Sequence, residues 1–546
     1  MDTLAQLVIA FDSAPIFLET QERPQLVYRI GAVGPIDGSW ININEASRLQ
    51  EIALELRDDY AKWIYSLNDE FSSGASPFPG ASSFLLSDCS CKRTEFFDTF
   101  NLICNLVFLR EIIETKRPSS IEVYGGDIQF ARSLAKIAPG VSMKVHRVRR
   151  FRDLGVRRLL SDIRYCLVVA VITLLSSPRN RLSEKISAGR RALFTVFPKM
   201  YDLEKGDRKY GGFFRREDHY VASIITDGLH QRVSVREYRR YRLEAAKRGI
   251  SVIDDFFEHS DWIRGLIWMI PLRLRFRLRR EICQFSGIDV FLWIREELQV
   301  SASRLTRFVV LSRAITRFIR VIRVKEFVYY LHEYPMGRLF SLLLSVHRPE
   351  VEKMGYQHGP AAWTKMLYCM DPQESRRASD FTKSVPMPDR VFAEDNKSAD
   401  IYRHSGYRNV EVLDKIWRLG YLDRIRPALD RNCWLIAPGL HDGHTLLTAL
   451  EPLLREKFDK TVLLRPHPLA RNEYLSGVES RFSLRITSEP IPDLFSRVGA
   501  VFVSYSSIGE EALKLGIPVY LVQIPGVVSE SPLADLQPDG GWITPQ

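Results

Sequence analysis

The last third of the chain alternates short apolar runs with polar loops and helix-like segments. The stretch CWLIAPGLHDGHTLLTALEPLL reads as a strand, a glycine-containing loop and a helix, and TVLLRPHP and VFVSYSSIGEEAL repeat this order. Short apolar runs bounded by turn residues favour buried strands, and strands that alternate with helical patterns favour a parallel sheet. We therefore predict a Rossmann-like βαβ domain over residues 386–546.

The first part of the chain also predicts an α/β domain. Residues 45–71 have helical periodicity, and residues 96–116 repeat apolar positions at spacings of three and four. SSIEVYGGD reads as a strand that ends in two glycines and Asp127, where ligand-facing residues gather in open α/β sheets. A plain Gly-Gly-Asp turn is an equally good interpretation. We take residues 1–385 as this first domain, with a boundary at the prolines near Pro386.

Residues 144–325 differ in composition from both flanks, because three basic stretches there contain almost no acid. YCLVVAVITLL, residues 165–175, is an unbroken apolar run beside the first of them. Eleven residues are too few to span a bilayer, which needs about 20. The run is therefore a buried helix or a segment that lies against a membrane surface. In the third stretch a helix would place four arginines on one face, namely Arg313, Arg317, Arg320 and Arg323. We predict a basic helical insertion that binds anionic lipid, against the alternative of a solvated flank on packed helices.

Composition and charge narrow the class of protein. With 546 residues and 45% hydrophobic residues, the chain predicts two or three folded domains. Its 77 Lys and Arg against 66 Asp and Glu give a net charge of +11, which favours anionic lipid, phosphorylated substrates or nucleic acid. Nucleic acid ranks last, since the arginines stand beside aliphatic runs and not among stacking aromatics. Seven scattered cysteines and an N-terminus without a basic n-region favour the cytoplasm.

Three loops of the predicted C-terminal sheet carry groups that suit a nucleotide phosphate. Glycines permit close backbone approach, hydroxyls and free N–H groups at a helix start bind phosphate, and a histidine held between prolines donates to a leaving group. An acid one turn further on suits ribose hydroxyls. The candidate donor-binding residues are Gly439, His441, Gly443, Arg465, Ser506, Ser507 and Glu511, with His467 as a catalytic residue.

These motifs resemble a known family. RPHP followed by SYSSIGEEALKLGIPV is similar to the His-Pro and Ser-Ser motifs of bacterial GT-B glycosyltransferases that use CMP-activated sugars, the sialyltransferase and Kdo-transferase type. LHEYPMGR and GYQHGPAAWTKMLYCMDP resemble central motifs of surface-carbohydrate biosynthesis proteins, so the similarity covers about residues 325–525. It implies two Rossmann-like domains that face a central cleft, with the donor nucleotide on the C-terminal one.

The resemblance also implies roles for single residues. His467 would assist the departure of CMP, Ser506 and Ser507 would hold its phosphate, and Glu511 would bind the sugar of the nucleotide. The base that deprotonates the acceptor would be Glu333, Asp127 or, as a weaker candidate, His358, which with Gln357 would line the cleft. Tyr-Gly-Gly-Asp stands where such enzymes carry a clearer acidic motif, so the base stays open.

The predicted activity is transfer of a nonulosonate or Kdo from a CMP-linked donor to a surface glycan such as capsule, lipopolysaccharide or O-antigen. No cofactor beyond this donor is expected, and no Asp-x-Asp motif stands in a metal-ligand setting, so we predict metal-independent chemistry. The expected partners are the nucleotide sugar, a glycan or lipid-linked acceptor and the inner face of the cell membrane. A polyol-phosphate transferase that uses CDP-glycerol, with His358 catalytic, and a non-catalytic polysaccharide assembly protein are the alternatives.

Overall fold

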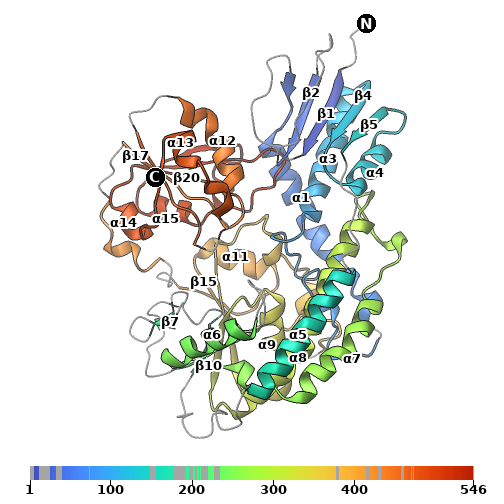
Figure 1. Ribbon diagram of the computed structural model, residues 1–546. Coiled ribbons are helices and arrows are strands. Elements are labelled where there is room, and N and C mark those ends of the chain that lie inside the picture. Colours follow the sequence, from blue (N-terminus) through green and yellow to red (C-terminus); the bar gives the residue numbers. More distant parts are fainter. Residues whose placement is uncertain are drawn as a thin grey trace.

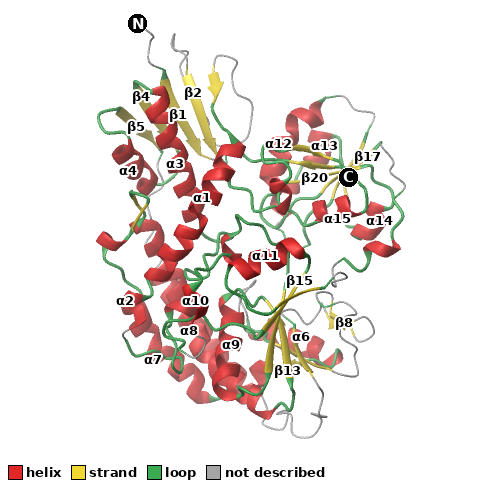
Figure 2. Ribbon diagram, turned by 180° about the vertical axis from the view of Figure 1, so that it is seen from behind, coloured by secondary structure: helices red, strands yellow, loops and turns green. Residues whose placement is uncertain are grey.

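Three mainly parallel sheets, each in Rossmann-like strand order, organise the chain (Figures 1 and 2). The computed structural model describes residues 5–11, 25–31, 40–72, 74–147, 155–175, 191–195, 201–202, 206–207, 210, 219–226, 234–376, 380–413, 419–427, 432–456, 460–468, 470 and 472–544. The predicted α/β class with Rossmann-like parallel sheets is confirmed, and the structure adds a third sheet to the two that were expected.

The first sheet lies near the N-terminus, and all its strands are parallel. Its strand order is β3 (Trp40–Asn42), β2 (Gln25–Ile30), β1 (Gln6–Phe11), β4 (Ser120–Tyr124) and β5 (Ser142–His146). The helices of this unit are α1 (Ala46–Ser66), α2 (Asp69–Ser72), α3 (Thr99–Lys116) and α4 (Ile128–Ile137). Every residue of β1 and β2 is buried, as expected for central strands of a parallel sheet that is covered on both faces.

The middle sheet has seven parallel strands. They follow the order β10 (Ser251–Val252), β9 (His219–Ser223), β6 (Arg191–Phe194), β13 (Glu326–Tyr330), β14 (Glu352–Tyr356), β15 (Arg390–Ala393) and β16 (Val410–Val412). The boundary expected near residue 386 therefore falls inside this sheet, because β15 pairs with β14. The basic region of residues 144–325 is also more than a helical insertion, since it supplies β6, β9 and β10.

Helices cover the middle sheet, and the long helix α8 (Phe291–Val321) contributes its apolar side to the core. They are α5 (Gly155–Leu175), α6 (Val235–Lys247), α7 (His259–Arg275), α8 (Phe291–Val321), α9 (Pro335–His347), α10 (Gln373–Arg376) and α11 (Asn396–His404). The apolar side of α8 is buried, and its Arg317 forms ion pairs with Glu258 and Asp261. The prediction of a lipid-facing α8 is thus not supported at Arg317, because its guanidinium already pairs with two carboxylates of the protein, the buried Asp261 and the partly exposed Glu258.

The C-terminal sheet is parallel except for its last strand. The order is β19 (Arg485–Ile486), β18 (Thr461–Leu464), β17 (Cys433–Ile436), β20 (Ala500–Val503), β21 (Val519–Leu521) and β22 (Gly541–Ile543). Its helices are α12 (Gly443–Arg455), α13 (Val478–Phe482), α14 (Ile491–Phe495) and α15 (Ile508–Lys514). Two apolar clusters, one on each face, form its core.

The segment that follows β21 joins the C-terminal sheet to the N-terminal unit. The amide of Gly31 donates to the carbonyl of Pro525 at 2.8 Å, and the side chain of Asn105 donates to the carbonyl of Gly526 at 2.9 Å. Gln50 exchanges two hydrogen bonds of 3.0 Å with the backbone of Ser529. A continuous polar seam therefore ties the first and third sheets together.

Candidate functional site

Three loops leave the C-terminal sheet at the same edge. In the parallel register Ile436 of β17 lies beside Leu464 of β18 and Phe502 of β20, so the segments that follow these residues start side by side. Two contacts join the loops after β17 and β20. The Ser504 hydroxyl donates to Asp442, and the His441 amide donates to the Tyr505 hydroxyl at 3.0 Å. The structure thus brings the predicted donor-binding segments to one edge.

The two glycines of the first loop are required for close packing against tyrosines. A Cβ on Gly439 would lie 2.5 Å from the Tyr505 ring, and one on Gly443 would lie 2.3 Å from the Tyr474 ring. The sequence predicted that these glycines admit a ligand, whereas the structure shows aromatic side chains in the space beside them. Burial, together with the nearby Asp442 carboxylate, raises the pKa of Tyr505, so its hydroxyl stays protonated at neutral pH.

The Ser-Ser motif, Ser506-Ser507, directly precedes α15. The side chain of Ser507 contacts a residue one helical turn further along the chain. The Ser507 hydroxyl donates to Glu511 at 3.3 Å and does not cap the helix. Tyr421 donates its hydroxyl to the other oxygen of the same carboxylate. Glu511 is buried. The predicted acid is therefore in place, with hydroxyl donors on both of its oxygens.

The Arg-Pro-His-Pro loop completes this edge. The Arg465 side chain donates to the carbonyl of Glu489 at 2.7 Å, and burial lowers its pKa. The carbonyl of His467 accepts the amide of Ala470 at 2.9 Å, which folds the loop back after the histidine. The histidine is half-exposed. A partly exposed imidazole and a guanidinium thus follow the same strand.

The middle sheet presents Gln357 and His358 directly after β14. Gln357 is fully buried and braces the loop: its amide donates to the carbonyl of Gly359 at 2.8 Å, and its oxygen accepts the amide of Glu394 at 2.8 Å. The His358 ring is half-exposed and lies 5.6 Å from the Tyr334 ring, edge to face. Gln357 therefore supports the loop that presents His358.

Glu333 is enclosed by the strand-to-helix turn after β13. It is 1% exposed, Tyr402 donates its hydroxyl to it, and the His332 ring lies 3.4 Å from the same oxygen. Leu331 has a left-handed backbone (φ 66°), and a Cβ on Gly337 would lie 2.3 Å from the Leu331 carbonyl oxygen. This tight turn buries the carboxylate, so it fits a structural role better than that of a base which meets an acceptor.

Asp127 caps a helix of the first sheet. Its Oδ1 accepts the amides of Gln129 at 2.8 Å and Phe130 at 2.9 Å, and its Oδ2 accepts the indole N–H of Trp293 at 2.9 Å. The sequence placed Asp127 correctly at a strand end. The structure commits both carboxylate oxygens to the scaffold, and none of these contacts reaches another candidate residue.

Sequence reasoning missed a group of polar residues that links the three units. Tyr334 donates to Glu95 at 2.8 Å. Burial and the nearby Glu95 and Asp98 carboxylates raise the pKa of Glu530, which the ammonium of Lys365 opposes. Glu530 also acts electrostatically on Tyr505 of the C-terminal loops. Glu530 is therefore close enough to influence titratable groups of all three units, although its surroundings, SESP, contain no motif.

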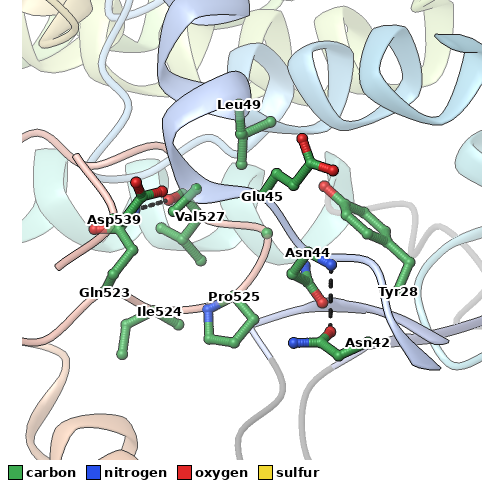
Figure 3. A pocket seen from close by; sticks show the side chains of 12 residues that line it. Tyr28, Asn42, Asn44, Glu45, Leu49, Gln523, Ile524, Pro525, Val527 and Asp539 are labelled. Carbon is green, nitrogen blue, oxygen red and sulfur yellow. Dashed lines mark hydrogen bonds between the residues drawn. The ribbon is translucent and has the colours of Figure 1, made fainter. Parts of the chain in front are cut away.

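A small polar cavity of about 170 Å³ lies apart from these loops, where β2 and β3 meet the segment after β21 (Figure 3). Tyr28, Asn42 and Glu45 line it from one side and Gln523 and Pro525 from the other. None of the predicted site residues lines it. It belongs to the polar seam between the first and third sheets.

Within the described ranges, no group of three or more His, Cys, Asp or Glu side chains is arranged to hold a metal ion. Metal-independent chemistry stays a prediction.

No family model and no curated protein matches the sequence. Solved structures do match. UDP-N-acetylglucosamine 2-epimerase from Rickettsia bellii is 10% identical, with a TM-score of 0.32, over 60% of this chain and 78% of its own. The calicheamicin glycosyltransferase CalG4 is 12% identical, with a TM-score of 0.35, over 64% and 83%. The wall teichoic acid polymerase TagF is 12% identical, with a TM-score of 0.28, over 68% and 79%. All three TM-scores lie below 0.5.

Proposed function

We propose that this protein is a glycosyltransferase that moves a sugar, a nonulosonate or Kdo, from a CMP-linked donor to a surface glycan at the inner face of the cell membrane. The observation that carries the proposal is the convergence of the loops after β17, β18 and β20 at one edge of a parallel sheet, where the Ser504–Asp442 and His441–Tyr505 contacts join the first and last of these loops. Ligands of open α/β sheets bind at this edge.

In this proposal the C-terminal loops bind the donor. Arg465 and His467 neutralise the phosphate charge that grows as CMP leaves, and Ser506 and Ser507 supply hydroxyl donors. Glu511 exchanges one of its present hydroxyl partners for a ribose hydroxyl. A leaving group that carries its own phosphate suits a cationic and hydroxyl-rich edge of this kind.

The acceptor base is His358 in our proposal. It is half-exposed, whereas Glu333 is enclosed and Asp127 is committed to a helix cap. Histidine is the side chain that most often acts as a general base in enzymes.

The same position of His358 favours a second candidate function, transfer of a polyol phosphate from CDP-glycerol. Incubation of the purified full-length chain with CMP-sialic acid, CMP-Kdo and CDP-glycerol separates the two, because each donor releases CMP. Release from a CMP-sugar supports our proposal. Release from CDP-glycerol alone would replace it with the second function.

His467→Ala tests the donor site. We expect CMP release to fall by about 10²–10⁴-fold, the usual effect of losing a general acid or base, while the thermal melt stays unchanged. His444→Ala is the matched control, since His444 is exposed on the adjacent α12 and outside the loops. Equal CMP release by wild type and His467→Ala, with unchanged polymer production in cells, would favour a non-catalytic assembly protein.

A further inference from the structure

Two neighbouring helices of the middle unit expose apolar side chains along one face each. On α5 these residues are Val156, Leu160, Leu167, Val171 and Leu174, and on α7 they are Ile263, Ile267, Ile270 and Leu274. The spacings of three, four and seven place each set on a single helix face. Leu160 is 61% exposed and Ile267 is 64% exposed. We call these nine residues the α5–α7 face.

The packing of the three helices explains why these residues remain outside. The buried Asp162 of α5 forms an ion pair with Arg273 of α7 and accepts the Ser303 hydroxyl of α8 at 2.6 Å. Gly265 of α7 lies against Cys166 of α5 and Val310 of α8, and a Cβ on it would meet both. The inner faces of α5 and α7 are therefore fixed against each other and against α8, and the apolar stripes point away. Figure 1 shows α5 and α7 side by side, at the opposite end of the molecule from β1 and β2.

The polar groups on this surface are cationic. The only acids of α5 and α7 are Asp162 and Asp261, and both are buried in ion pairs. Exposed arginines stand beside the apolar stripes, namely Arg157, Arg164 and Arg275. The α5–α7 face therefore carries positive charge that nothing on these two helices neutralises at the surface.

A groove between α7 and α8, at the border of this face, contains two arginines. Its volume is about 440 Å³, and Ile263, Ile267 and Trp268 line it together with Arg264 and Arg313. Arg313 is exposed and makes no hydrogen bond or ion pair with any residue in the described part of the chain. The guanidinium of Arg264 donates to the carbonyl of Pro77 at 3.0 Å, whereas its buried Nε has no partner there. Burial and the neighbouring Arg313 guanidinium lower the pKa of Arg264, so an anion in the groove would relieve the repulsion between them.

We propose that the α5–α7 face docks on an anionic lipid bilayer, with the aliphatic side chains at the level of the acyl chains and a lipid phosphate between Arg264 and Arg313. A helix with an apolar face and basic flanks lies in the membrane interface in this way. The positive charge of the α5–α7 face argues against a dimer formed through this face. A symmetric contact would place the same arginines of two copies against each other. Among the described helices none is long and apolar enough to cross a bilayer, so the contact is with the surface.

This inference deepens the proposed function, because it names the surface that would hold the enzyme near a lipid-linked acceptor. Vesicle binding needs no donor, however, so the two proposals can fail separately. The test is flotation of the full-length chain with vesicles of phosphatidylcholine alone or with one third phosphatidylglycerol. We expect binding to the anionic vesicles only, and weaker binding as salt rises.

Substitutions locate the contact. Leu160→Glu with Ile267→Glu should weaken binding to anionic vesicles by about tenfold or more, because two aliphatic anchors are replaced by carboxylates. Arg313→Gln should weaken it about fivefold, the usual effect of one basic residue near the surface. Leu536→Glu is the matched control, since Leu536 is 62% exposed in the C-terminal unit and should bind as wild type does.

Three results would overturn the proposal: no binding by the wild-type chain, equal losses in the double variant and the Leu536 control, or a wild-type dimer that the double variant converts to monomer. CMP release in vesicle-free solution should stay within about twofold of wild type in the double variant, because the face is remote from the donor loops. A loss of CMP release in all chains would count against the proposed function and leave the docking result standing.

Discussion

Replacing Asp127 by alanine distinguishes its two candidate roles, base and helix cap. The substitution removes an acceptor for the first-turn amides of Gln129 and Phe130 and for the indole N–H of Trp293. Loss of an N-cap costs about 1 kcal/mol, and a buried donor left unsatisfied costs about 1–3 kcal/mol. We therefore expect a destabilisation of about 2–4 kcal/mol, with no change in CMP release per folded molecule.

Asp127→Asn refines the test. The amide oxygen still accepts the two backbone N–H groups, whereas the amide nitrogen cannot accept from Trp293, so only the indole part of the cost, about 1–3 kcal/mol, should remain. Trp293→Phe removes the same donor. In the double variant the cost should therefore be smaller than the sum of the two single costs.

Hydrogen exchange is the assay of choice, because three units need not unfold in one step. In Asp127→Ala the amides of Gln129 and Phe130 should exchange about fivefold faster or more, as the first turn of α4 opens more easily. A catalytic Asp127 would give the opposite pattern. Native exchange and melting in Asp127→Ala, with CMP release reduced by two orders of magnitude, would refute the capping interpretation.

Two further predictions concern stability. Burial raises the pKa of Glu297 to about 8 from 4.5, so the folded state holds one extra proton between these values and its stability falls as pH rises from 4.5 to about 8. Urea denaturation should show that Glu297→Gln flattens this fall, by about 2 kcal/mol between pH 6 and pH 8, and an unchanged slope would contradict the assignment. Gly526→Ala should destabilise the seam by more than about 2 kcal/mol, because Gly526 has φ 65° and its Cβ would lie 2.3 Å from the Arg29 carbonyl oxygen. Gly420→Ala, which meets no atom within 4 Å, is its control, and equal midpoints for the two would contradict the prediction.

The C-terminal sheet and the position of its loops could be predicted from the sequence, because local patterns encode them. Each apolar run before Pro438, Arg465 and Ser504 is a parallel strand, and parallel strands present their carboxyl ends at one edge. No distant residue was needed for that inference. The tyrosines that pack on Gly439 and Gly443 were missed, because their positions depend on side-chain packing between loops.

The middle sheet could not be predicted, for a different reason. β6 and β10 are short and lie between basic or helical segments, so charge dominated the local pattern. β15 follows two prolines that resemble a linker, yet it pairs with β14 in a parallel register. Strand pairing of this kind is a long-range property that no local window contains.

Candidate residues were missed or misjudged wherever their environment comes from distant segments. Glu530 stands in a stretch without a motif, and its neighbours Glu95, Lys365 and Tyr505 come from three separate parts of the chain. Glu333 is an acid at the carboxyl end of a strand, which is why the sequence made it a candidate base. Only the packing of Tyr402 and His332 around it reveals that it is enclosed.

The polar seam has a consequence for biosynthesis. Gln50 and Ser529, which bond each other, are 479 residues apart, and a ribosome that adds about 5–20 residues per second needs roughly half a minute to a minute and a half to cover that distance. The first sheet is complete once β5, which ends at His146, has been made, so its contact surface is bare for most of this time. The seam is made by amides such as Gln50 and Asn105, whose hydrogen bonds water can supply in the meantime. An apolar junction would expose hydrophobic surface on every nascent chain and favour aggregation. A polar junction instead leaves a hydrated surface on the N-terminal unit until the C-terminal segment has been synthesised.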